Sequence, residues 1–204
     1  MKICNAYCGI GGNRRLWPEG HDITAVEMNP DIAKIYQDFF PNDTVIVGNA
    51  HDYLLEHYKE YDFIWSSPPC PSHSRIRKAG THRGQQPPIY PDMTLYQEIL
   101  LLQGYAPLDK RWAVENVMPW YKPLIGGQES GRHLFWSNFY ISNYIGTTNT
   151  IDSIDGTYPG DAHGFNIDNY KIDNRRKILR NCVDPKLGLH IYNCAFRDKQ
   201  LSLI

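Results

Sequence analysis

The sequence predicts an α/β protein with a doubly wound, mostly parallel sheet and a small loop-rich annex. Short apolar runs typical of buried strands alternate with amphipathic stretches typical of helices. Glycines, prolines and acidic residues directly follow several of these runs, which is the pattern at the edge where the strands of an open parallel sheet end. The chain has 204 residues, enough to bury one full core.

Four strands are expected in the first half of the chain. They cover residues 3–7, 22–26, 44–47 and 61–65. Helices are expected between them at 30–39 and 52–58, and Asn29 followed by Pro30 is a typical start for the first helix. This alternation indicates a parallel sheet whose crossover helices cover its faces.

The second half is expected to add a helix, two strands and a closing helix. The helix covers residues 94–105, the strands cover 111–114 and 133–141, and the closing helix starts at Asp184 and Pro185. Residues 142–173 are rich in Asn, Asp, Gly and Thr and show little periodicity. We therefore expect a core at 1–140, an annex at 141–174 and a C-terminal segment at 175–204 that returns to the core.

Charge and cysteine content narrow the class of protein. The formal net charge is -1, so a nucleic-acid partner has to be held by local basic patches. Five cysteines without a C-x-x-C pair predict neither a disulfide framework nor a zinc site, and they favour a reducing compartment. We find no signal-peptide pattern and no apolar run of membrane-spanning length. We expect a cytoplasmic protein without a metal and without a membrane partner.

A cysteine stands between prolines directly after the fourth expected strand. Each proline in Ser67-Pro68-Pro69-Cys70-Pro71 fixes its own φ and pushes the preceding residue towards extended backbone. The direction of the Cys70 thiol is thereby set before a ligand binds, as a nucleophile requires. The alternative is a small residue buried in a turn, which is common for a free cysteine.

Glycines follow the first strand, and an acid follows the second. Residues 9–12 contain three glycines, which let the backbone approach a ligand closely. Glu27 ends the second strand, where an acid binds ribose hydroxyls in dinucleotide-type sites. A Gly-Lys-Ser/Thr ending for phosphates is absent, so the pattern favours adenosine without a required triphosphate. Taken alone, the glycine loop is equally typical of a tight turn.

Residues 75–88 are expected to form a basic loop that contains glycine and proline. No acidic residue occurs between Asp62 and Asp92. Such a stretch is suited to close over a polyanion, because its arginines can reach phosphate oxygens and its glycines allow movement. An ordinary solvated loop is the alternative.

Glu115 follows the strand at 111–114 and is therefore expected at the same sheet edge as Cys70. If Trp112, Trp120 and Tyr121 shield it, its pKa is raised and it can donate a proton. Capping of the next segment is the alternative role.

Taken in order, these motifs resemble those of the cytosine-C5 DNA methyltransferases over nearly the whole chain. Tyr7-Cys8-Gly9-Ile10-Gly11-Gly12 is similar to the family's cofactor loop, Pro69-Cys70-Pro71 to its nucleophile motif, Glu115-Asn116-Val117 to its catalytic-acid motif, and Arg180-Asn181-Cys182-Val183 to the segment that closes its cofactor pocket. The resemblance implies a Rossmann-like methyltransferase fold, S-adenosylmethionine as cofactor and DNA, double-stranded by preference, as substrate.

The resemblance also implies roles for single residues. Cys70 would add to C6 of a flipped-out cytosine, Glu115 would stabilise the charge at N3, and Arg132 would hold the base. The residues implied at the cofactor are Tyr7 near the adenine, the loop Cys8, Gly9, Ile10, Gly11 and Gly12, Glu27 on the ribose, and Met28, Asn49, Ala50, Pro69 and Asn181. The residues implied at the DNA are Ser74, Arg75, Arg77, Lys78 and Arg83.

The sequence departs from the family pattern at several positions. Pro71 stands where many members have Gln, and Asn5 and Asn49 stand where the family has Asp. The arginine-rich motif is matched only loosely near Arg132, so His133 is a second candidate for the role of its second arginine.

The region at 141–174 is also shorter than the family's usual target-recognition domain. This reduced region implies a short, relaxed target site, or a partner subunit or homo-oligomer that supplies recognition.

Three other functions compete with this reading. Ser67-Pro68-Pro69 also resembles the motif of amino-methyltransferases acting on adenine N6 or cytosine N4, although these have an aromatic residue in place of Cys70. An RNA-directed C5 enzyme would carry a Cys-Phe-Thr segment, which the chain lacks. A catalytically silent DNA-binding or regulatory subunit would have no use for Cys70 and Glu115. Bacterial restriction-modification and self-protection of a mobile element, including a viral protein in the host cytoplasm, both fit the sequence.

Overall fold

The computed structural model describes residues 1–146 and 163–197 of the chain. Its centre is a seven-stranded sheet of order β3-β2-β1-β4-β5-β7-β6. The strands are β1 (Lys2–Ala6), β2 (Asp22–Glu27), β3 (Thr44–Val47), β4 (Phe63–Ser66), β5 (Arg111–Val117), β6 (Gln128–Ser130) and β7 (His133–Ser137). The strands from β1 to β5 are parallel, whereas β7 runs antiparallel to both β5 and β6. The predicted doubly wound, mostly parallel sheet is confirmed.

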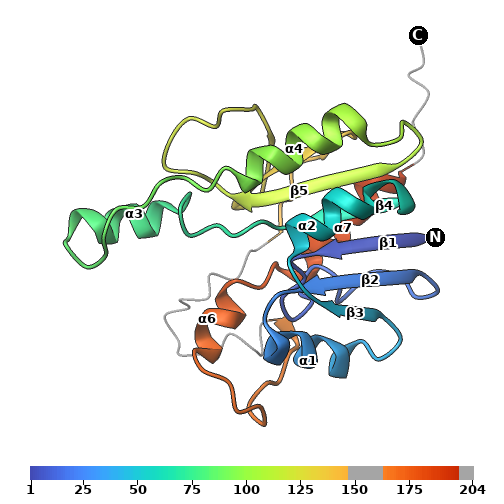
Figure 1. Ribbon diagram of the computed structural model, residues 1–204, viewed down its shortest axis with the longest axis horizontal. Coiled ribbons are helices and arrows are strands. Elements are labelled where there is room, and N and C mark those ends of the chain that lie inside the picture. The colour runs from blue at the N-terminus through green and yellow to red at the C-terminus, as the bar shows by residue number, and fades with distance from the viewer. Residues whose placement is uncertain (147–162, 198–204) are drawn as a thin grey trace.

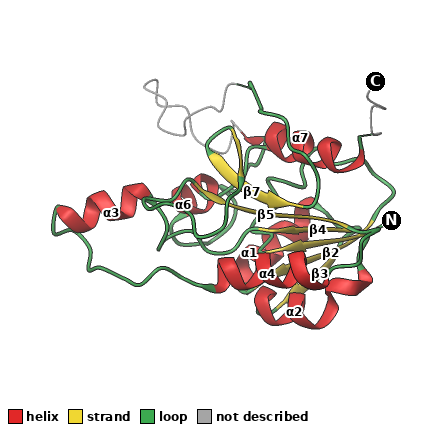
Figure 2. Cartoon of the chain, turned by 90° about the horizontal axis from the view of Figure 1, so that it is seen from above, coloured by secondary structure: helices red, strands yellow, loops and turns green. Residues whose placement is uncertain are grey.

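Helices cover both faces of the sheet (Figures 1 and 2). On one face, α2 (Ala50–His57) and α4 (Thr94–Tyr105) pack on an apolar cluster that includes Trp112 and Trp136. On the other face lie α1 (Pro30–Phe39) and α7 (Pro185–Phe196). A 3-10 helix, Tyr58–Glu60, follows α2. The result is a three-layer sandwich in which β1 and β4 are central and fully covered.

Local sequence signals explain where α1 and α7 begin. The side chain of Asn29 accepts hydrogen bonds from the backbone N–H groups of Asp31 and Ile32, and proline occupies the first turn. Asp184 caps α7 in the same way, with Pro185 as the first helical residue.

Two further helices of the described residues lie beyond the carboxyl edge of the sheet (Figure 1). They are α3 (Arg75–His82), which projects away from the body of the molecule, and α6 (Arg175–Arg180). The expectation of a loop throughout 75–88 is therefore wrong for its first half. Ser74 caps α3, because its hydroxyl accepts a hydrogen bond from the N–H of Arg77.

Several boundaries shift by one or two residues, and larger differences from expectation concern β5, β6 and β7. β5 continues to Val117, so Glu115 lies inside this strand. β7 ends at Ser137 instead of residue 141, and the three-residue strand β6 is too short to give an alternating pattern. The expected annex at 141–174 lies partly outside the described residues. Among the helices that the structure describes, none is long and apolar enough to cross a membrane.

Candidate active site

The carboxyl edge of the sheet gathers the segments that carry the motifs. In the strand register, Ala6 pairs with Val26 on one side and Ser66 on the other, and Ser66 pairs with Val114. The residues that follow these four therefore emerge at one edge: Tyr7 and the glycine loop, Glu27, the Cys70 loop, and Glu115. A doubly wound fold places its ligand sites at this edge.

The glycine loop is held by Glu27 at the end of β2. The carboxylate accepts hydrogen bonds from the N–H groups of Gly9, at 3.1 Å, and Asn29, at 2.9 Å. A Cβ on Gly12 would lie 2.2 Å from the sulfur of Cys182 and 2.3 Å from the carbonyl oxygen of Val183. Only glycine allows this close approach, so the structure brings two of the predicted motifs together across most of the chain length.

The other residues expected at the cofactor differ in solvent exposure and in whether their polar groups already have hydrogen-bond partners. Asn49 caps α2: its side-chain oxygen accepts from the N–H of His51, and its amide nitrogen donates to Asp52. Met28 is 63% exposed, whereas Ala50 is buried. Asn181 and Pro69 are exposed, and the buried side chains of Cys8 and Ile10 point into the protein core.

The Cys70 loop is attached to the segment that follows β5. The side-chain amide of Asn116 donates to the carbonyl of Pro68, at 2.9 Å, and the indole N–H of Trp120 donates to the carbonyl of Ser72, at 3.1 Å. These bonds fix the loop on both sides of the cysteine.

The Cys70 thiol is half-buried. Burial and the negative charge of Glu115 raise its pKa to about 11, while a backbone hydrogen bond and the charge of Lys177 on α6 act in the opposite direction. The thiol is therefore protonated at neutral pH in the free protein.

Glu115 is buried and faces His133 rather than Arg132. The Nδ1 atom of His133 lies 2.9 Å from a carboxylate oxygen of Glu115, although the approach is not aligned for a hydrogen bond. Arg132, the next residue, is exposed. Of the two candidates that the sequence left for the role of the arginine, the structure places His133 against the acid.

Sequence reasoning missed Glu98 on α4, whose side chain is fully buried. Its carboxylate accepts hydrogen bonds from the hydroxyls of Tyr7, at 2.6 Å, and Ser66, at 2.5 Å, and lies 3.0 Å from Nδ1 of His51. The hydroxyl of Tyr7, the residue expected near the adenine, thus points to this carboxylate. The sequence signal that could have identified Glu98 is its position on the apolar face of the predicted helix.

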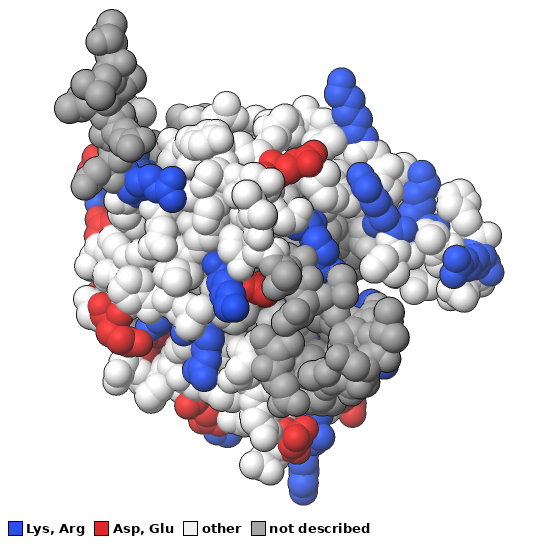
Figure 3. Space-filling view, turned by 180° about the vertical axis from the view of Figure 1, so that it is seen from behind, with Lys and Arg blue, Asp and Glu red and all other residues white. Residues whose placement is uncertain are grey.

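The basic stretch forms an arm, residues 73–91, that leaves and rejoins the body at one point. At its base, the N–H of Asp92 donates to the hydroxyl of Ser72, at 2.9 Å. Figure 3 shows Lys and Arg side chains gathered on the projecting part. The ammonium of Lys78 lies 4.1 Å from the centre of the Trp120 ring, and Arg83 is exposed.

The two other basic residues predicted to contact DNA already have hydrogen-bond partners within the protein. Arg75 donates through Nε to the carbonyl of Pro119, and Arg77 donates to the side chain of Gln86 and the carbonyl of Pro87.

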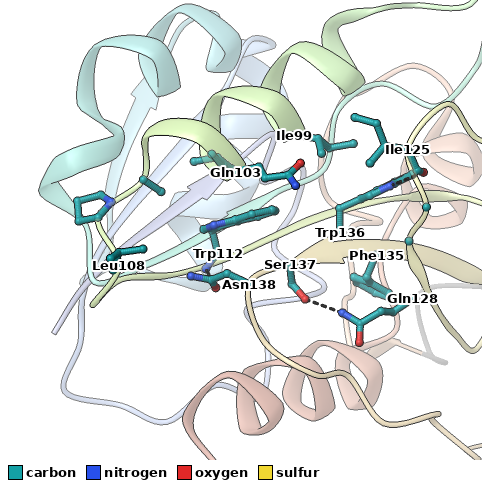
Figure 4. A pocket seen from close by; sticks show the side chains of 15 residues that line it. Ile99, Gln103, Leu108, Trp112, Ile125, Gln128, Phe135, Trp136, Ser137 and Asn138 are labelled. Atoms are coloured by element: carbon teal, nitrogen blue, oxygen red, sulfur yellow. Dashed lines mark hydrogen bonds between the residues drawn. The ribbon is translucent and has the colours of Figure 1, made fainter.

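A cavity of about 310 Å³ lies at the opposite edge of the sheet, between the end of α4 and the β5–β7 pair (Figure 4). Trp112 and Trp136 line it, and Leu108 at its rim is 96% exposed. Among its polar residues, Gln128 donates to the hydroxyl of Ser137, and Asn138 donates to the carbonyl of Lys110. Its lining contains no residue of the glycine loop or of the Cys70 loop. Within residues 1–146 and 163–197, no three His, Cys, Asp or Glu side chains form a group that could hold a metal ion.

Comparison with known proteins gave no match to a family model and none to a curated protein. Solved structures do match. One is a mutant of DNMT2 from Spodoptera frugiperda, with 23% identity over 57% of this chain and 35% of that chain and a TM-score of 0.40. Another is the putative methyltransferase yhhF from Escherichia coli, with 15% identity over 67% of this chain and 73% of that chain and a TM-score of 0.43.

A third is a SAM-dependent methyltransferase from Agrobacterium tumefaciens, with 12% identity over 59% of this chain and 40% of that chain and a TM-score of 0.40. The chain thus spans about a third of the DNMT2 chain. Likenesses this distant carry no argument about activity. The chain is a mixed α/β protein with a Rossmann-like, doubly wound sheet, and the solved structures that match it include methyltransferases.

Proposed function

We propose that the protein is a DNA cytosine-C5 methyltransferase that takes its methyl group from S-adenosylmethionine. One observation carries the proposal: the register of β4 and β5 brings the Cys70 loop and Glu115 to one sheet edge, where the hydrogen bond from Asn116 to Pro68 joins their segments. Addition to a cytosine ring requires a sulfur nucleophile beside an acid that stabilises the developing charge.

The residues around the glycine loop fit S-adenosylmethionine. Each oxygen of Glu27 accepts one backbone N–H and retains a lone pair for a ribose hydroxyl. A Cβ built on Gly9 meets no atom within 4 Å, so the backbone there is open to a ligand. When bound, the cofactor supplies an electrophilic methyl group, while Glu27, Met28 and the loop bind and orient it.

The proposed reaction uses Cys70 and Glu115 in sequence. The Cys70 thiol gives its proton to solvent, and the thiolate forms a bond to C6 of the flipped-out cytosine, which makes C5 nucleophilic and places negative charge at N3. Glu115 in its protonated form stabilises this charge by donating a proton or a hydrogen bond. After C5 has taken the methyl group, a base removes the C5 proton, the C6–S bond breaks and the thiolate leaves.

The charges link the two steps. An ionised Glu115 raises the pKa of Cys70, so the thiol stays protonated while no base is bound. Protonation or hydrogen bonding of Glu115 weakens that effect, and the charge of Lys177 favours the thiolate further. Attack is therefore favoured once the target base engages Glu115.

The arm is the proposed DNA contact, together with the reduced region after β7. Lys78 and Arg83 would pair with backbone phosphates and hold the flipped state beside Cys70. The target site would be short and relaxed, or a partner subunit or homo-oligomer would add recognition.

The test is transfer of a tritiated methyl group from S-adenosylmethionine to double-stranded DNA, with the product mapped by bisulfite sequencing. Label at cytosine C5 is expected for the wild type and is expected to vanish in Cys70→Ser. Cys194→Ala, which changes a buried cysteine on α7 away from this edge, is the matched control and should keep activity.

Other outcomes identify the competing functions. Label on an exocyclic amine that persists in Cys70→Ser would indicate an amino-methyltransferase. Label on RNA alone would indicate an RNA-directed enzyme. Binding of cofactor and DNA without any label would indicate a silent binding subunit.

A further inference from the structure

Glu98 is the one fully buried carboxylate among the described residues, and it lies where two functional segments begin. Its partners come from three elements. Tyr7 is the first residue after β1 and opens the glycine loop, Ser66 ends β4 and precedes the Cys70 loop, and His51 is in the first turn of α2. One side chain on α4 thus bridges the starts of both loops.

Packing alone does not explain an acid at this position. The neighbouring buried residues of α4 are Leu95, Ile99 and Leu102, and burying a carboxylate costs free energy unless hydrogen bonds compensate. An apolar side chain would fill the same space at lower cost. The acid is therefore better explained by the groups that it holds than by the stability of the helix.

The backbone at Tyr7 supports this explanation. Tyr7 has a positive φ of 56°, which is uncommon for a residue other than glycine and persists only where the surroundings enforce it. The hydroxyl of Tyr7 donates a hydrogen bond to the carboxylate of Glu98. The turn into the glycine loop is thus fixed from the α4 side.

We propose that Glu98 is a positioning residue that holds the start of the glycine loop and the start of the Cys70 loop in fixed register. The inference rests on the proposed function, in which the first loop binds the cofactor and the second carries the nucleophile. Glu98 itself touches neither reactant. Its role is to keep the methyl donor and the sulfur at a constant spacing.

Hydrogen exchange in the free protein tests the proposal without requiring catalysis. In Glu98→Gln, amides in residues 7–12 and 67–74 are expected to exchange about tenfold faster, which corresponds to about 1.4 kcal/mol of lost local stability. Amides in β2, β3 and α7 should keep their rates. Gln97→Ala, which changes the exposed neighbour on α4, is the control and should alter neither loop.

Two single-partner variants separate positioning from general destabilisation. Tyr7→Phe should loosen the glycine loop and weaken binding of S-adenosylhomocysteine, while Ser66→Ala should loosen the Cys70 loop and change the rate of Cys70 alkylation by iodoacetamide. Adding Glu98→Gln to either variant should then add less than its full effect.

Faster exchange spread evenly over the sheet, or confined to α4, would overturn the proposal. The proposed function can fail separately: loss of exchange protection at both loops without any methyl transfer would keep Glu98 as a positioning residue of another reaction.

Discussion

The side-chain amide of Asn116 donates a hydrogen bond of 2.9 Å to the carbonyl oxygen of Pro68. The bond joins the residue after the candidate acid to the loop that carries the candidate nucleophile, and Asn116 is buried. The relative position of Cys70 and Glu115 is therefore set partly by this pair.

Replacement of Asn116 by Ala should destabilise the protein. The carbonyl of Pro68 would be left buried without a donor, at a cost of about 1–3 kcal/mol. Urea unfolding measures the loss. Asn143→Ala, at an exposed position, is the control and should change the stability by less than about 0.5 kcal/mol.

Replacement of Glu115 by Gln should speed the alkylation of Cys70 but slow methyl transfer. The pKa of the thiol should fall below about 11, because a negative charge that raises it is removed. Alkylation of Cys70 at pH 8, followed by mass spectrometry, should become severalfold faster, since the rate follows the thiolate fraction. Methyl transfer should nevertheless fall.

Lys177→Gln should slow the same alkylation, because it removes a charge that lowers the pKa of the thiol. An unchanged alkylation rate in both variants would contradict the electrostatic link between Glu115, Lys177 and Cys70.

Replacement of Gly12 by Ala should disrupt the contact between the glycine loop and residues 181–183. The added methyl group would overlap the sulfur of Cys182, so backbone has to shift, at a cost of about 1–3 kcal/mol. The melting temperature should fall, and the affinity for S-adenosylhomocysteine should decrease. Gly104→Ala on α4, where a Cβ meets no atom within 4 Å, should instead stabilise the protein by about 0.5–1 kcal/mol.

The stability difference between wild type and Glu98→Gln should depend on pH. Burial raises the pKa of Glu98 above its ordinary value of 4.5, so the folded protein binds this proton more tightly than the unfolded chain. The stability contribution is present below the unfolded pKa and is lost as pH rises through the raised folded pKa. Urea unfolding should show that the stability of the wild type relative to the variant is lower at pH 8 than at pH 5. A higher relative stability of the wild type at pH 8 would refute this prediction.

DNA binding by the arm should depend on salt. Replacing Lys78 or Arg83 by Gln should each reduce the slope of log affinity against log salt by about 1, because one phosphate contact is lost. Lys34→Gln on α1, whose ammonium pairs with Asp38, is the control and should leave the slope unchanged. Equal slopes in all variants would place the DNA elsewhere.

The sequence predicted those elements whose signals are local. The bounds of α1 and α4 agree with expectation, and the capping residues Asn29 and Asp184 mark helix starts as predicted. The helix α3 was missed, because it is short and its sequence, RIRKAGTH, contains few apolar residues. The strand β6 depends on pairing with β7, which no local pattern reveals.

The parts of the candidate site that follow directly from the order of strands and motifs could also be predicted from the sequence. The order of strands and motifs placed Glu27 beside the glycine loop, and the hydrogen bond from Gly9 agrees with that placement. The pairing of His133 with Glu115 depends on the β5–β7 register, and the position of Glu98 depends on three separate elements. Such long-range contacts are set by tertiary packing, and a single sequence does not specify them.

The hydrogen bond between Asp92 and Ser72 closes the base of the arm, so the chain leaves and re-enters the body at nearly the same place. A segment whose two ends lie this close together can be exchanged for another segment without moving the rest of the chain. Its length and composition can drift over generations without disturbing the sheet, because a longer closed loop costs little extra entropy. Grafting arms of different sequence between these two residues should therefore yield chimaeras that keep the same folded body, and under the proposed function these chimaeras would differ in the nucleic acid they engage.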